Sequence, residues 1–246
     1  MSEIYLSVII PAHNEEKRLP KTLEDIGVYL SRQNYFSEII AVDAGSIDRT
    51  QEIIRERMKQ VSNLRLLEVK NCQGKGQAIR EGMAVAQGSF RLFTDADNST
   101  SIDQVEKMLP YFRQGYDVVI GSRDIKGAVL NPPQPFLRKM ILGRGFRLLR
   151  KLIIGLWSIQ DTQCGFKCFS QKASLDIFPK ITIMGFSFDA EVLVLAKKFG
   201  YKIKEIPVVW VNDLNSKVKP GDMVKMLLEL LKIKLNSIMG SYGQEK

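Results

Sequence analysis

Two aspartates one residue apart, Asp95 and Asp97, are the residues of this chain best placed to do chemistry. They follow a short, mostly apolar run, 88–92, which predicts a strand entered from a glycine turn. In open α/β sheets, ligands bind at the edge where the carboxyl ends of the strands lie. Carboxylate oxygens there suit Mg²⁺ or Mn²⁺, which also share the oxygens of substrate phosphates. The alternative is that Asp97 begins an Asx turn and that Asp95 is merely solvated.

Composition limits what the chain can be. Its 246 residues are 45% hydrophobic, enough for one large domain or one domain with an appendage. A net charge of +9 favours phosphate-bearing partners, namely nucleic acid, an anionic lipid surface or a phosphorylated substrate. The sequence begins without a signal-peptide pattern, and no apolar run approaches the roughly 20 residues that span a bilayer. Three cysteines without a CxxC pair indicate reduced core thiols, as in a cytosolic protein.

Strands alternate with helices over the first 120 residues. Apolar, β-rich runs predict strands at 5–10, 37–42, 64–69, 89–94 and 117–120, and helical patterns occupy the segments between them, the first opening at 14–16. This alternation predicts an α/β fold, a mostly parallel central sheet flanked by helices. The segment 128–135, with two adjacent prolines, is expected to be a loop.

The second half contains a basic amphipathic helix, predicted at 136–157. Its apolar residues share one broad face and its lysines and arginines share the other, and no acidic residue occurs between Asp124 and Asp161. Such a face favours an anionic surface, with lipid headgroups as the natural candidate, over a purely soluble or oligomeric role. Arg138 lies on the apolar arc at the start of this helix, which suggests a specific role. A second mostly apolar helix carrying three lysines is predicted at 222–238.

Four motifs follow successive predicted strands: Pro11-Ala12-His13-Asn14-Glu15, Asp43-Ala44-Gly45-Ser46, Gly74-Lys75-Gly76 and Asp95-Ala96-Asp97. In this order the set resembles the inverting glycosyltransferases of family 2, which implies a GT-A nucleotide-sugar-binding fold with C-terminal amphipathic helices. Further runs in the second half, above all Asp161-Thr162-Gln163-Cys164-Gly165-Phe166-Lys167, resemble the branch of dolichyl-phosphate glucosyltransferases and dolichol-phosphate mannosyltransferases. This resemblance implies transfer of a hexose, with glucose from UDP-glucose favoured, to a polyprenyl phosphate of the dolichyl type.

The resemblance assigns roles to individual residues. It implies that the donor is bound by Pro11, His13, Glu15, Asp43, Lys75, Asp95, Ala96, Asp97, Arg123 and Lys217, and that Asp95 and Asp97 hold the Mg²⁺ or Mn²⁺. Because a phosphate acceptor is already an anion near neutral pH, catalysis needs cations that hold two anions together more than it needs a base. We therefore expect Arg123 and Arg138 to act with Asp97 in catalysis, and Arg123, Arg138 and Gln163 to bind the acceptor.

Several alternatives stay open. If the acceptor were a saccharide hydroxyl, a base would be required, and Asp189 is the candidate; otherwise Asp189 and Glu191 are a helix cap or a buried ion pair. Gln163 and Lys167 fit scaffold packing as well as ligand contact. The family usually has a second aspartate at Ala44, which contacts the base, so a non-catalytic nucleotide-sugar-binding protein is a further hypothesis.

The expected organisation follows from these assignments. Residues 1–215 are expected to form the GT-A glycosyltransferase domain, including the helix 136–157, and 216–246 a helical appendage and tail. Eukaryotic glucosyltransferases of this kind carry an N-terminal membrane anchor that this sequence lacks, so we expect a cytoplasmic protein held peripherally on the cytoplasmic face of a membrane by its two basic helices. We expect no nucleic-acid partner, since no aromatic residues are interleaved with the basic charge, and the same helices are compatible with a homodimer.

Overall fold

The computed structural model describes residues 3–132, 145–211 and 220–243. In these ranges the main sheet has seven strands in the order β3-β2-β1-β4-β7-β5-β8. Their bounds are β1 Leu6–Ala12, β2 Ser37–Asp43, β3 Leu64–Glu68, β4 Phe90–Thr94, β5 Val118–Ser122, β7 Phe166–Ser170 and β8 Ile203–Pro207. Only β7 among them runs antiparallel to its neighbours, β4 and β5. The predicted mostly parallel α/β sheet is confirmed.

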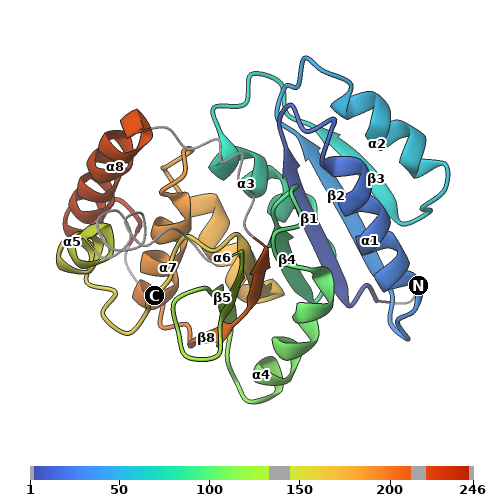
Figure 1. Cartoon of the computed structure of the whole chain (residues 1–246). Coiled ribbons are helices and arrows are strands. Elements are labelled where there is room, and N and C mark those ends of the chain that lie inside the picture. Colours follow the sequence, from blue (N-terminus) through green and yellow to red (C-terminus); the bar gives the residue numbers. More distant parts are fainter. Residues whose placement is uncertain (1–2, 133–144, 212–219, 244–246) are drawn as a thin grey trace.

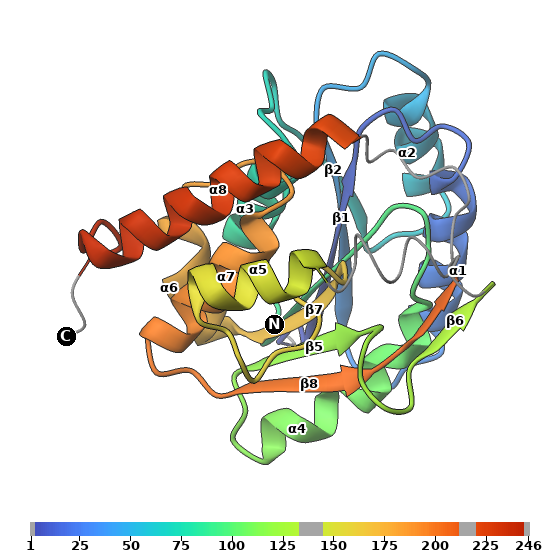
Figure 2. The ribbon, with the colours of Figure 1, turned by 60° about the vertical axis from the view of Figure 1, so that its left-hand side comes forward.

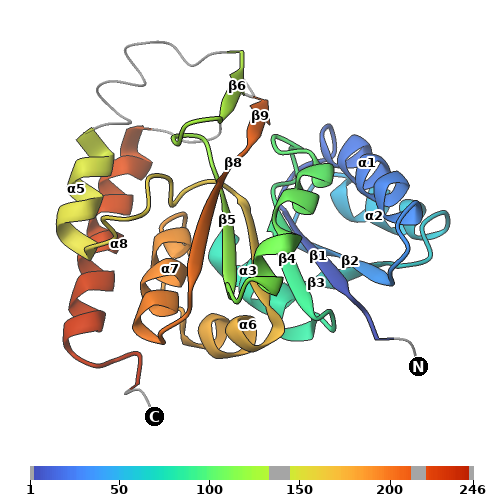
Figure 3. The same cartoon turned by 90° about the horizontal axis from the view of Figure 1, so that it is seen from below.

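Helices cover both faces of the sheet (Figures 1 and 3). One face is covered by α1 Leu19–Ser31, α2 Thr50–Met58, the 3₁₀ helix η1 Ile102–Lys107 and α4 Leu109–Arg113. The other is covered by α3 Lys75–Val85, α6 Gln171–Ile177, the 3₁₀ helix η3 Phe178–Lys180 and α7 Phe188–Lys198. Two further helices, α5 Gly145–Ile154 and α8 Pro220–Ile238, pack side by side beyond α7 (Figure 2).

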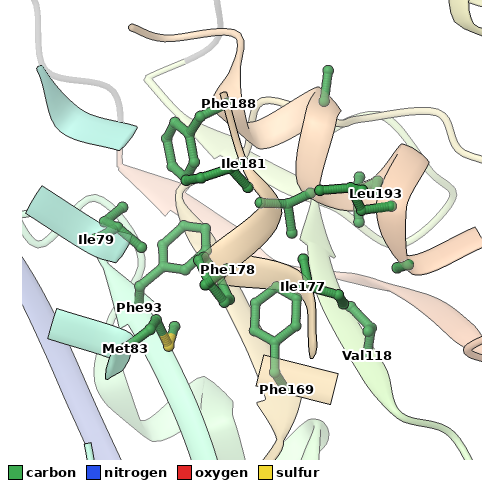
Figure 4. Close-up of a cluster of buried hydrophobic side chains, with 14 of the residues drawn as sticks. Ile79, Met83, Phe93, Val118, Phe169, Ile177, Phe178, Ile181, Phe188 and Leu193 are labelled. Atoms are coloured by element: carbon green, nitrogen blue, oxygen red, sulfur yellow. The ribbon is translucent and has the colours of Figure 1, made fainter. Parts of the chain in front are cut away.

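The side chains of each strand alternate between two apolar layers, as a pleated strand requires. In β1, Ile9 packs with α3 and α7, whereas Val8 and Ile10 pack with α1. Aromatic rings fill the layer beside α7 (Figure 4): Phe93 of β4 stacks on Phe169 of β7 with centroids 6.1 Å apart. The strand that leads into Asp95 is therefore anchored on the side of α7 by buried rings, each of which removes a large apolar area from water.

The strand order reverses between β1 and β4. From β1 the chain builds outward through β2 and β3, and β4 then lies on the opposite side of β1. The chain leaves β1 toward β2 and leaves β4 toward β5, which lie on opposite sides of this pair in the sheet, and ligands of open α/β sheets bind at the carboxyl ends of the strands at such a point. The segment 95–97 follows β4 at this switch point, and its predicted place at the carboxyl end of a central strand is confirmed.

Three local predictions were wrong. The first helix begins at Leu19 rather than at 14–16, since residues 13–16 are bonded to the loop after β2. The segment 128–135 is not all loop, because β6 Val129–Asn131 pairs in parallel with β9 Val209–Val211. The basic helix ends at Ile154 and not at 157, because Gly155 adopts a positive φ of 70°. Residues 136–144 of that predicted helix lie outside the described part of the chain.

Candidate active site

The loop after β4 is held on several sides. Asp97 accepts the backbone N–H of Ser99 at 3.0 Å through Oδ1, which is the Asx turn weighed above. Its Oδ2 lies 3.8 Å from Nη1 of Arg18, at the start of α1. Thr22 donates its hydroxyl to the carbonyl of Ala96 at 2.7 Å. The turn and the charged role are therefore compatible, because one carboxylate oxygen makes the turn while the other faces a cation.

Asp95 lies between a lysine and a glycine. Lys75, the first residue of α3, places Nζ 2.5 Å from Oδ1 of Asp95. On another side Gly165 approaches so closely that a Cβ at this position would lie 2.0 Å from Oδ2 of Asp95. A side chain at position 165 would displace this carboxylate, which is the physical reason for glycine in the segment before β7.

A chain of opposite charges continues inward from this pair. Lys167 is fully buried and donates to the carboxylate of Asp189, and also to the carbonyl of Cys164 at 2.6 Å. Burial raises the pKa of Asp189, and Lys167 and Lys75 oppose that effect only in part. The ion pair expected as an alternative for Asp189 is present, and Oδ1 of the carboxylate is bound by the ammonium of Lys167.

The pKa of Asp97 is raised above the ordinary aspartate value, first by burial and then by the negative charge of Asp95. For Lys75, burial alone would lower the pKa, but Asp95 and Asp189 outweigh it and raise the pKa. Two carboxylates that repel each other in a partly buried site favour a cation between them. A divalent ion bound between Asp95 and Asp97 would offset this repulsion.

The donor set fits Mg²⁺ or Mn²⁺. Within the described ranges no cluster of three or more His, Cys, Asp or Glu side chains is arranged to hold an ion. Asp95 and Asp97 would therefore supply two oxygens, and the remainder would come from phosphate and water, which is how these ions usually bind.

The predicted nucleoside-binding residues lie at or just beyond the carboxyl ends of β1 and β2. Hydrogen bonds join the loop after β1 to the loop after β2. His13 bonds through Nδ1 to the carbonyl of Ala44 at 3.0 Å, and the backbone N–H of Glu15 donates to Thr50 Oγ1 at 2.8 Å. Asp43 is buried and accepts the N–H groups of Gly45 and Ser46. Pro11 lies within β1, in register with Val42. The binding roles of Pro11, His13, Glu15 and Asp43 stay predictions.

Arg123 begins the loop after β5 and is held firmly. It donates through Nε and Nη2 to both oxygens of Asp161, at 2.7 and 3.0 Å, and its guanidinium stacks 4.7 Å above the ring of Trp210. Although burial alone would raise the pKa of Asp161, Arg123 holds it well below the usual range. The fixed guanidinium retains further N–H donors, so its predicted phosphate contacts stay a prediction.

The segment 161–167 connects these groups. Asp161 orients Arg123, Gly165 abuts Asp95, and Lys167 pairs with Asp189. Nε2 of Gln163 is buried there without a hydrogen-bond partner among the described residues. A buried donor of this kind is costly unless a ligand satisfies it, which agrees with the predicted acceptor contact of Gln163. Arg138 and Lys217 lie outside the described residues.

Sequence reasoning missed three contributors to the site. Arg18 faces Asp97 and also pairs with both oxygens of Glu15, at 2.7 Å each. The spacing of Glu15 and Arg18 was its only sequence signal. Asp161 and Gly165 lie in the run 161–167 that carries the family resemblance, but their contacts with Arg123 and Asp95 depend on the fold.

Comparisons with known proteins show the family of the chain. A family model described as glycosyl transferase family 2 matches residues 7–178. The chain therefore belongs to glycosyl transferase family 2, and it is a glycosyltransferase. The predicted GT-A fold is confirmed.

Individual relatives extend over almost the whole chain. A dolichyl-phosphate beta-glucosyltransferase of Trichomonas vaginalis is 37% identical, with 94% of this chain and 73% of the relative covered. The dolichyl-phosphate beta-glucosyltransferase of Saccharomyces cerevisiae is 35% identical, with 99% and 78% covered. Among solved structures, glucosyl-3-phosphoglycerate synthase from Mycobacterium tuberculosis, in complex with Mn²⁺, UDP and phosphoglyceric acid, shares the fold with a TM-score of 0.69 at 17% identity, covering 99% of this chain and 80% of that one.

Proposed function

We propose that this glycosyltransferase moves glucose from UDP-glucose to a polyprenyl phosphate of the dolichyl type, with inversion, at a membrane surface. The observation that carries the proposal is the similarity of almost the whole chain to dolichyl-phosphate beta-glucosyltransferases. The site supports it, because the aspartate pair and Lys75 follow strands at the switch point where a nucleotide sugar would lie. Arg123 follows β5 in the same sheet and is held by Asp161.

Separate groups of residues would bind the two anions of the reaction, the diphosphate of the donor and the phosphate of the acceptor. Asp95 and Asp97 would hold Mg²⁺ or Mn²⁺, which as a Lewis acid offsets charge on the departing nucleoside diphosphate. Lys75 lies beside the same carboxylates and would bind the diphosphate. Arg123, oriented by Asp161 and Trp210, would hold the acceptor phosphate for in-line attack on the anomeric carbon. The bond from that carbon to the diphosphate breaks as the bond to the acceptor oxygen forms.

The state of Asp189 favours a phosphate acceptor over a hydroxyl acceptor. A hydroxyl needs a base to take its proton, and Asp189 is the residue predicted for that role. Its carboxylate is 3% exposed and is bound by Lys167. An acceptor phosphate is already ionised near neutral pH, so the reaction proceeds without a free carboxylate base.

The surface of α5 and α8 supports membrane contact through exposed apolar side chains, whereas the sequence predicted contact through a basic face. The leucines of α5 point outward, with Leu148 57% and Leu152 60% exposed, while Arg150 is buried and donates to the carbonyl of Gln160 at 3.1 Å. The expected basic outer face of this helix is therefore wrong at Arg150. Within the described ranges no helix is both long and apolar enough to cross a bilayer.

The second helix continues this surface. In α8 the exposed apolar residues recur every three or four positions, which places them in one stripe, and exposed lysines flank it. The stripe consists of Val224, Leu228, Leu231, Leu235 and Ile238. A helix with an apolar stripe and flanking lysines suits the interface of an anionic bilayer. We define the apolar surface as this stripe together with Leu148, Leu149 and Leu152, and assign it to membrane docking on the cytoplasmic side.

Transfer itself is tested with radiolabelled UDP-glucose, Mg²⁺ and dolichyl phosphate in detergent. We expect label to enter the organic phase with the wild-type chain and not with Asp97→Asn. Parallel reactions with GDP-mannose and with undecaprenyl phosphate define the donor and the lipid. Absence of labelled lipid with every donor and acceptor would refute the proposal.

Docking is tested by sedimentation with vesicles containing phosphatidylserine. We expect Leu152→Glu and Leu228→Glu each to reduce the bound fraction several-fold, because a charge is costly in the apolar part of the interface, while UDP binding is unchanged. Leu175→Glu is the matched control, since Leu175 is 50% exposed on α6, outside the apolar surface. If the variants bind vesicles like the wild type but convert a dimer to a monomer in analytical ultracentrifugation, the surface is a dimer interface instead.

A further inference from the structure

In this structure Lys75 already neutralises one of the two predicted metal ligands. Its ammonium lies 2.5 Å from Oδ1 of Asp95, and the two side chains are only 20% and 24% exposed. Arg18 stands in a similar relation to Asp97, but at 3.8 Å. Each carboxylate of the pair thus has a cationic side chain beside it, and the one on Asp95 is the closer of the two.

Lys75 is held at this position by its backbone. The N–H of Gly76 donates to the carbonyl of Met184 at 2.8 Å, and a Cβ on Gly74 would lie 2.5 Å from that carbonyl oxygen. The ammonium also lies 5.9 Å above the ring of Phe188. The base of the lysine is therefore fixed, whereas its long side chain can move the ammonium over several ångströms.

Asp95 cannot turn toward the segment before β7. Gly165 closes one side of the carboxylate, since a Cβ there would lie 2.5 Å from Cγ of Asp95. A divalent ion that binds Asp95 must then take a position close to the ammonium. Two cations within a few ångströms of each other repel strongly in a partly buried site.

We propose that Lys75 is an exchangeable counter-ion for Asp95. When the metal and the donor bind, the Lys75 ammonium leaves the carboxylate of Asp95, which then binds the metal, and forms an ion pair with the diphosphate of the donor. The inference rests on the proposed function, because it assumes a metal and a nucleoside diphosphate at this edge. Lys75 therefore opposes metal binding when no nucleotide is present and supports it when the diphosphate arrives. The metal and the nucleotide sugar bind together, since the diphosphate supplies the replacement partner that the lysine needs.

The proposal predicts effects of opposite sign from one substitution. We expect Lys75→Met to bind Mn²⁺ alone about ten-fold more tightly than the wild type, measured by the loss of the free-ion EPR signal. The same variant should bind UDP in the presence of Mn²⁺ about ten-fold more weakly in calorimetry. Lys75→Arg keeps the charge and should stay near the wild type for Mn²⁺ alone. Lys70→Met removes an exposed lysine of the preceding loop and should change neither affinity.

A measurement on the wild type avoids any effect of substitution on folding. Mn²⁺ should speed the reaction of the Lys75 amine with an amine-reactive reagent, and UDP added with Mn²⁺ should slow it, as followed by peptide mass spectrometry. An unchanged rate with Mn²⁺, or a Lys75→Met variant that binds Mn²⁺ no more tightly, overturns the exchange. If the wild type binds neither Mn²⁺ nor UDP, the metal-dependent function itself fails.

Discussion

Replacing Gly165 with alanine adds one methyl group against a predicted metal ligand. The new Cβ would lie 2.0 Å from Oδ2, 2.5 Å from Cγ and 2.6 Å from Oδ1 of Asp95. Ordinary contacts begin at about 3.4 Å, so the carboxylate must move by more than roughly 1 Å. Because the carboxylate is the end of a side chain, the displacement costs little folding energy but moves the group that would bind the metal.

The expected loss of function follows from this displacement. A misplacement of about 1 Å in a reacting geometry costs on the order of 100-fold in rate, or about 2.7 kcal/mol of transition-state stabilisation. We therefore expect kcat/KM for glucosyl transfer to fall about 100-fold in Gly165→Ala. Mn²⁺ affinity should fall as well, while the melting temperature changes by only a few degrees.

The assay combines lipid-phase radiolabel, EPR with Mn²⁺ and thermal unfolding by circular dichroism. Gly27→Ala is the matched control, because this glycine lies within α1 and its Cβ would meet only side-chain atoms of Val61, the nearest at 3.3 Å. That variant should retain full transfer, with stability changed by less than about 1 kcal/mol. Wild-type transfer and Mn²⁺ binding in Gly165→Ala would refute the assignment of Asp95 as a metal ligand.

The remaining predictions concern three carboxylates that are buried or half-buried. Asp161→Asn should lower the free energy of unfolding by about 3 kcal/mol in urea titrations, because it leaves Arg123 without its partner. The folded-state pKa of Asp161 is depressed. The stability that this carboxylate contributes is therefore present above the ordinary aspartate pKa of about 3.9 and is lost as the pH falls below it. In that pH range Asp161→Asn should lose less stability than the wild type does. Asp97, whose pKa is raised by burial and by a neighbouring aspartate, should release Mn²⁺ on acidification at a higher pH than an ordinary aspartate would, which EPR titrations measure. Glu191→Gln should destabilise the chain by about 2 kcal/mol in the same urea assay, since it weakens acceptance from Thr182 and Tyr242.

The sequence carried most of the fold because the decisive features are local and periodic. Apolar runs of strand length alternate with helical patterns, and a parallel sheet places the ends of its strands at one edge. The segment 95–97 therefore followed from strand order without any tertiary information. By contrast, β6 is three residues long and depends on its pairing with β9, which lies far along the chain. No local pattern specifies such a strand.

The orientation of α5 shows where sequence patterns lose information. Its two-faced pattern fixes which residues share a side, but not which side meets the protein. The structure turns Arg150 inward, where backbone carbonyls of Ile159 and Gln160 accept its N–H groups, and leaves leucines outside. The usual assumption that the apolar face of a helix is buried therefore fails for α5. The same limit applied to Lys75, because nothing in its motif indicates that Asp95 is its partner.

The segment 184–187 lies between α8 and the start of α3, which carries Lys75 of the predicted metal site. On α8, Glu229 accepts the N–H of Ser187 at 3.2 Å, and its Oε1 would lie 2.4 Å from a Cβ placed on Gly185. The adjacent residue, Met184, accepts the N–H of Gly76 and so seats the start of α3, from which Lys75 reaches Asp95. Two hydrogen bonds therefore connect α8 to the start of α3 through the segment 184–187.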